Sequence, residues 1–132
     1  MKFILLIYND DSVLESLPAG QYDAMMRGCL SHADELRQEG RLTDSQMLED
    51  APTAKTVRIR NGKVTTTDGP FAETKEILGG FNLIEAENME EAVRMAMEFP
   101  WASTGCVEVR PVREIDTVRR RVTASETSAA TS

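Results

Sequence analysis

Residues 3–8 read FILLIY, an apolar run that stops at the polar triplet of residues 9–11, NDD. Its length and its polar boundary suit a β-strand rather than a longer helix. A strand without polar positions is typical of the interior of a sheet, where both faces are covered. The sequence therefore predicts a central strand over residues 3–8, and the neighbouring elements are placed around it.

One helix is expected on each side of the chain's midpoint. After Pro18, apolar residues recur at helical spacing until Gly40 ends the pattern. Asn88 has the form of an N-cap, with Glu91 three residues later, and Pro100 ends this second helix. The stripe of the first helix consists of Tyr22, Met25, Met26, Cys29, Ala33 and Leu36.

Further strands are expected over residues 41–48, 55–60, 63–67, 81–86 and 106–112. Asn61-Gly62 is a strong signal for a tight hairpin, because a type I′ turn needs positive φ at both central residues. Without this inserted hairpin the order is βαββαβ, which predicts an α+β, ferredoxin-like domain. The domain is expected to span residues 1–116, and the Ser/Thr/Ala-rich residues 117–132 to form a flexible tail.

Composition narrows the function. The 132 residues carry a net charge of −7, which argues against nucleic acid and against an anionic membrane as the main partner. The late arginines at 110, 113, 119, 120 and 121 form either a local basic patch or, as we expect, a solvated tail. One histidine and two distant cysteines give no metal-ligand spacing and no disulfide framework, and we expect a cytoplasmic protein without a cofactor.

Residues 68–76, DGPFAETKE, are followed by LGGF at residues 78–81, and VEVRPV occupies residues 107–112. These segments resemble the YCII-related family with its DGPF motif. The resemblance implies a dimeric α/β barrel: a homodimer with sheet set against sheet, and a cavity between sheet and helices in each subunit. It implies no settled activity.

The resemblance also implies an acid/base pair. The family's aspartate corresponds to Asp68, while the place of its histidine falls near Cys29, one helical turn before the only histidine, His32. Each residue has a plainer interpretation. Asp68 begins an Asp-Gly-Pro turn, and His32 lies at the edge of the apolar stripe, where a half-exposed surface histidine is equally expected. Cys29 is expected to be a small buried apolar residue.

A ligand site is expected from the same loop and from two strands. Phe71 and Lys75 are candidates in the loop, and Arg58, Glu108 and Arg110 on the strands would bind a carboxylate or phenolate if their polar faces line a cavity. If those faces meet water, they are ordinary exposed charges.

The sequence leaves three functions open. The first is a small-molecule enzyme of the lyase, isomerase or dehalogenating type that uses Asp68 with His32. The second is a non-catalytic ligand-binding or regulatory dimer, since family members are often encoded beside extracytoplasmic-function sigma factors. The third is a scaffold whose dimer interface is its main feature.

Overall fold

The structure is a computed structural model that describes the backbone of residues 1–131 and the side chains of residues 1–126. Four strands form an antiparallel sheet in the order β2-β5-β1-β6. Their bounds are β1 Lys2–Asp10, β2 Leu42–Met47, β5 Glu76–Glu85 and β6 Gly105–Pro111. The apolar run of residues 3–8 thus lies in a central strand, as predicted, and the strand order confirms the ferredoxin-like α+β fold.

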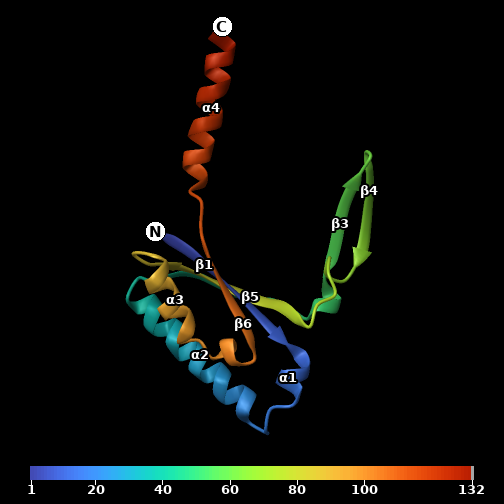
Figure 1. Ribbon diagram of the computed structural model, residues 1–132, viewed down its shortest axis with the longest axis vertical. Helices are drawn as coiled ribbons and strands as arrows, with labels where there is room; N and C mark the ends of the chain where they lie inside the picture. Colours follow the sequence, from blue (N-terminus) through green and yellow to red (C-terminus); the bar gives the residue numbers. More distant parts are fainter. Residues whose placement is uncertain (132) are drawn as a thin grey trace.

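Both main helices lie on the same side of the sheet (Figure 1). These are α2 Gln21–Gln38 and α3 Met89–Met97, and a one-and-a-half-turn helix, α1 Asp11–Glu15, follows β1. The predicted cap of α3 is present, because the Glu91 backbone N–H donates to Asn88 Oδ1 at 2.9 Å. Short 3₁₀ turns occupy Ala51–Thr53 and Pro100–Ser103.

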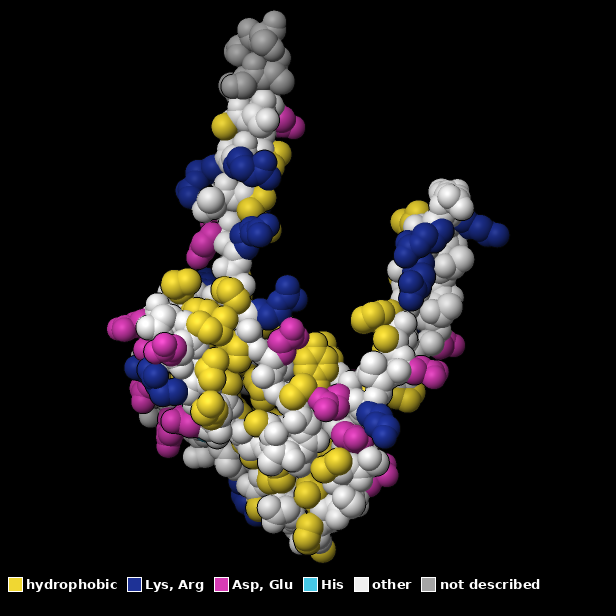
Figure 2. All heavy atoms as spheres, in the orientation of Figure 1, with side chains coloured by type: hydrophobic (Ala, Val, Ile, Leu, Met, Phe, Trp, Pro, Cys, Tyr) yellow, Lys and Arg dark blue, Asp and Glu magenta, His cyan; other side chains and the backbone are white. Residues whose placement is uncertain are grey.

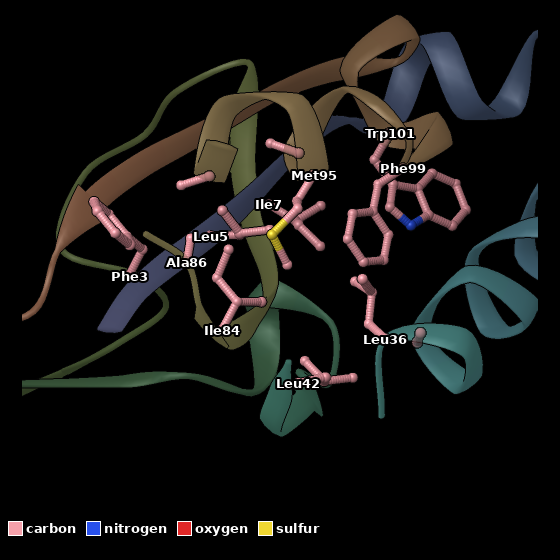
Figure 3. Close-up of a cluster of buried hydrophobic side chains, with 13 residues drawn as sticks. Phe3, Leu5, Ile7, Leu36, Leu42, Ile84, Ala86, Met95, Phe99 and Trp101 are labelled. Carbon is pink, nitrogen blue, oxygen red and sulfur yellow. The ribbon is translucent and has the colours of Figure 1, made fainter. Parts of the chain in front are cut away.

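The hydrophobic core fills the space between these helices and the sheet. Phe3, Leu5, Ile84 and Phe99 are almost completely buried, with at most 2% of each residue exposed. Figure 3 shows Phe99 and Trp101 side by side among these side chains. The alternate strand positions point to the opposite face, which no helix covers, and are only half-buried.

The inserted hairpin, β3 Lys55–Arg60 and β4 Lys63–Asp68, forms a separate two-stranded sheet that projects from the body (Figure 1). The turn is built as predicted, with φ of 53° at Asn61 and 74° at Gly62. Because the hairpin stands apart, its strands are exposed on both faces along most of their length.

The chain ends in α4 Ile115–Thr131, which extends away from the body (Figure 1). The tail expected from residue 117 is therefore helical rather than irregular, because good helix formers such as its arginines outweigh the Ser and Thr content. Its flexibility and its separation from a domain of residues 1–116 stay predictions, and Ser132 lies outside the described residues. Among the described residues, no helix is long and apolar enough to cross a membrane.

Candidate functional site

The expected acid/base pair is not formed within one chain. Asp68 ends β4, its side chain is 84% exposed, and its carboxylate accepts a hydrogen bond from Lys55 Nζ at 2.6 Å. His32 lies in the helix layer, where α2 contacts α3. Within one chain Asp68 and His32 are not brought together, because the hairpin carries Asp68 away from the helices, and their joint action stays a prediction. Any separate catalytic role of either residue stays a prediction.

His32 is buried, with 8% of the residue exposed, and is not the surface residue considered above. Its Nε2 lies 3.3 Å from the backbone oxygen of Met95 and 3.3 Å from a carboxylate oxygen of Glu98. Its ring packs edge-on against Phe99, with ring centroids 4.4 Å apart. These contacts join α2 to α3, so His32 has a structural place in the helix layer.

The predicted ligand residues are spread over the hairpin, the loop and the uncovered sheet face. Phe71 is 79% exposed, and Arg58 Nη2 donates to its backbone oxygen at 3.5 Å. Glu108 and Arg110 are exposed on the uncovered face, where Glu108 accepts a hydrogen bond from the Tyr8 hydroxyl at 3.3 Å.

Lys75, the remaining predicted ligand residue, is exposed, and its positive charge lies close enough to the Asp10 carboxyl group to influence the pKa of that group. The pKa of Asp10 is held below its ordinary value, first by the hydrogen bond from the Ser12 hydroxyl and to a smaller extent by Lys75. The five predicted ligand residues therefore do not converge on one point.

A cavity of about 110 Å³ lies between α2 and the sheet, where the family resemblance implied one. We call it the helix–sheet cavity. Its walls are mostly apolar, and none of its lining residues is Asp, Glu, His, Lys or Arg. The lining residues are Ile7, Asn9, Tyr22, Met26, Cys29, Leu30, Ser45, Gln46, Met47, Gly79, Gly80, Phe81, Asn82 and Trp101.

Asn82 is the most informative polar residue in this cavity. It lies on β5, and only 3% of it is exposed. Its Oδ1 accepts a hydrogen bond from Ser45 Oγ at 2.5 Å, whereas its amide nitrogen has no hydrogen-bond partner among the described residues. Among the described residues, every fully buried side-chain nitrogen has a hydrogen-bond partner. The unpartnered amide nitrogen of Asn82 is therefore not fully buried, and it is open to the cavity that Asn82 lines. A free donor therefore faces a largely apolar cavity.

Cys29 faces the same cavity from α2 and stays a neutral thiol. Burial raises its pKa, and a hydrogen bond with the Trp101 indole lowers the pKa by less. A thiol with a raised pKa is a poor nucleophile. Its position matches the expectation of a small apolar residue better than that of a catalytic one.

A second and larger cavity, of about 640 Å³, lies at the base of the hairpin. We call it the hairpin cavity. The loop of residues 68–76, the connector between β2 and β3, and the adjoining ends of β1 and β5 enclose it. It is lined by Tyr8, Leu48, Glu49, Asp50, Ala51, Thr53, Ala54, Lys55, Thr56, Pro70, Phe71, Ala72, Thr74, Glu76, Ile77 and Leu78. Of the predicted ligand residues, only Phe71 contributes directly to its wall.

The sequence did not single out Asn82, although a signal was present. In the run FNLIE of residues 81–85, Asn82 shares a strand face with Ile84, so a polar residue stands where the pattern requires an apolar one. The described residues contain no group of three or more His, Cys, Asp and Glu side chains that could hold a metal ion.

The model of the YCII-related domain matches residues 1–116. An uncharacterised protein of Rhizobium meliloti (strain 1021) is 36% identical over 114 residues, which covers 85% of this chain and 92% of that protein. Among solved structures, 5-chloro-2-hydroxyhydroquinone dehydrochlorinase of Burkholderia phenoliruptrix AC1100, in complex with 2,5-dihydroxybenzoquinone, is 14% identical. It covers 86% of this chain and 95% of its own, with a TM-score of 0.43. At this level of similarity the two proteins need share no chemistry.

Proposed function

Because the chain belongs to the family of YCII-related domains, we propose that it is a homodimeric small-molecule-binding protein whose ligand occupies the helix–sheet cavity. The buried amide of Asn82 is the observation that carries the proposal. Its amide nitrogen has no partner among the described residues and is open to the cavity, so it can donate a hydrogen bond to a bound molecule with an acceptor oxygen, and such a bond contributes about 1 kcal/mol. A ligand of this kind gives the amide a role at a core-facing position of β5.

The walls of the cavity set the class of ligand. No charged side chain lines it, and an unpaired charge is expensive to bury, so a neutral molecule is expected. The volume of about 110 Å³ lies below the usual range for small-molecule sites, roughly 300–1,000 Å³, so the ligand is expected to be no larger than one ring. The aromatic rings of Tyr22 and Trp101, with centroids 5.7 Å apart, and the side chain of Met26 favour an apolar ring.

Of the enzyme and the ligand-binding hypotheses, the contacts of one chain favour binding without catalysis. The helix–sheet cavity holds no acid/base pair, since Asp68 lies on the hairpin and His32 packs against α3. A reaction that needs proton transfer would require groups that the cavity of one chain does not supply. A ligand-binding or regulatory role needs only the pocket and its free donor.

The dimer is proposed from the uncovered face of the sheet. Ile4, Leu6, Phe81 and Leu83 form its half-buried centre, and no helix of the same chain lies over them. A second copy placed sheet against sheet would cover this strip on both subunits at once, as a two-fold interface requires. Light scattering at micromolar concentration should give twice the chain mass of 14.7 kDa. Leu6→Glu should reduce it to one chain, and a monomeric wild-type protein would contradict the dimer.

Ligand binding can be tested by NMR with two probes of the same shape, phenol and toluene. Phenol carries an acceptor oxygen and toluene does not. We expect phenol to shift the amide signals of Cys29 and Asn82 and the indole signal of Trp101, and to bind about fivefold more tightly than toluene, the value of one hydrogen bond. Asn82→Leu should abolish this preference.

Gln38→Leu provides the matched control, because it removes an exposed amide at the end of α2, outside the cavity. It should leave both affinities unchanged. The proposal fails if phenol shifts no signal of the cavity, or if wild type and Asn82→Leu distinguish the two probes equally well.

A further inference from the structure

The hairpin cavity is separate from the helix–sheet cavity and has the size of a small-molecule site. Its volume of about 640 Å³ falls within the usual range for such sites, roughly 300–1,000 Å³. Tyr8 and Leu78 form its floor on the sheet, and Pro70 and Phe71 form a wall from the loop. Phe71 is 79% exposed, so a large aromatic ring stands uncovered beside the cavity. An exposed aromatic ring at a concave site is typical of a binding surface.

The unpaired charges in the lining of this cavity are negative, whereas Arg58 lies outside the lining and donates to the Phe71 backbone oxygen. Glu49, Asp50 and Glu76 line it, and none of them forms an ion pair with a described residue. Lys55 is the one cationic residue in the lining, and its Nζ is already paired with the Asp68 carboxylate at 2.6 Å. Figure 2 shows several acidic side chains and a basic one around the base of the hairpin, and further Lys and Arg side chains farther out on it and on α4. An anionic ligand would therefore be repelled here.

Two ionisable groups near the cavity are uncharged: Tyr8, which lines it, and Cys106, which pairs with Tyr8 on β6. The pKa of the Cys106 thiol is raised to about 11, first by its hydrogen bond to the Glu76 carboxylate and then by burial. The pKa of Tyr8 is raised by burial and by Glu108, and Arg110 opposes this only weakly. Both groups stay neutral at pH 7, so they add no positive or negative charge to the cavity.

From this geometry we propose that the hairpin cavity is a binding site for an organic cation, a substituted ammonium group on an apolar body. The apolar part would lie against Leu78 and Pro70, and the ammonium group would face the carboxylates of Glu49, Asp50 and Glu76. The rings of Tyr8 and Phe71 add cation–π attraction, which favours quaternary and other bulky ammonium groups over a compact, strongly hydrated cation. This proposal stands independently of the ligand in the helix–sheet cavity.

Benzyltrimethylammonium is a suitable probe, with benzyl alcohol as its neutral counterpart and phenylacetate as its anionic one. In titrations of the full chain at low ionic strength, followed by NMR, the cation should bind best and the anion worst. The shifted amide signals should be those of Phe71, Ala72 and Leu78, and not those of Cys29 and Asn82. Added salt should weaken the binding of the cation.

Two variants test the residues that carry the inference. Glu76→Gln should weaken the binding of the cation about two- to fivefold, which is the range for one partly exposed charge. Phe71→Ala should weaken it by a similar factor, and because Phe71 is mostly exposed the fold should be unaffected. Glu73→Gln is the matched control, since Glu73 lies in the same loop but does not line the cavity.

Three results would overturn the proposal. The first is phenylacetate binding as tightly as the cation, or the cation failing to bind. The second is Glu73→Gln weakening binding as much as Glu76→Gln, which would mean attraction to overall charge alone. The third is that the cation shifts only signals of the helix–sheet cavity. The hairpin cavity would then have no ligand, whereas the separate proposal of phenol binding at Asn82 would be unaffected.

Discussion

Replacing Asn82 by leucine separates a functional from a structural role of this residue. The change removes one neutral hydrogen bond, from Ser45, which contributes about 1 kcal/mol. Ser45 is only half-buried, so its hydroxyl can turn to water. The leucine buries an apolar side chain in place of the amide, which stabilises the folded state by about 2 kcal/mol. Its extra volume can enter the cavity of about 110 Å³. We therefore expect Asn82→Leu to raise the free energy of unfolding by about 1 kcal/mol while it abolishes the preference for phenol over toluene.

Urea unfolding followed by circular dichroism measures this difference. The protein concentration must be the same for both proteins, because unfolding of a dimer depends on it. An unchanged slope with denaturant would show that the compactness of the folded state is unaltered. Gln38→Leu, at an exposed position, should change stability by less than about 0.5 kcal/mol. If Asn82→Leu lowers stability by more than about 2 kcal/mol, the amide is a structural group and its assignment to a ligand is refuted.

Gly28→Ala should stabilise the protein by about 1 kcal/mol in the same assay, because a Cβ there meets nothing within 4 Å and alanine favours the helix. Gly105→Ala should destabilise it by more than about 3 kcal/mol, because its Cβ would overlap the backbone oxygen of Tyr8 and force β6 away from β1; equal stability of the two variants would contradict this. Cys106 should react slowly with iodoacetamide at pH 8, because its pKa of about 11 leaves little thiolate. Glu76→Gln should lower that pKa towards its ordinary value and speed the reaction, and an unchanged rate would show that Glu76 does not control the thiol.

The elements of the fold could be predicted because each has a strong local signal. The unbroken apolar run of residues 3–8 indicated a central strand, Asn61-Gly62 indicated the hairpin turn, and Asn88 indicated the start of α3. These signals depend only on residues next to one another in the chain. The helix at Ile115–Thr131 was missed because its Ser, Thr and Ala content is typical of a flexible tail.

The site could not be predicted to the same extent, because it depends on how distant elements meet. Asp68 and His32 belong to segments whose relative position no local pattern determines, and the structure places one on the hairpin and the other against Phe99. Arg58 donates to the Phe71 backbone oxygen beside the hairpin, while Glu108 accepts from Tyr8 on the sheet, so these predicted ligand residues lie at different places. Asn82 carried a signal in its strand, but a single polar residue in an apolar pattern does not reveal whether its partner is the protein or a ligand.

A crystal structure of the chain soaked with phenol tests the central claim most directly. We expect one phenol ring in the helix–sheet cavity beside Trp101 and Cys29, with its oxygen within hydrogen-bonding distance of the Asn82 amide nitrogen. Phenol bound elsewhere on the chain, with this cavity closed or empty and the Asn82 amide paired to another protein group, would contradict it.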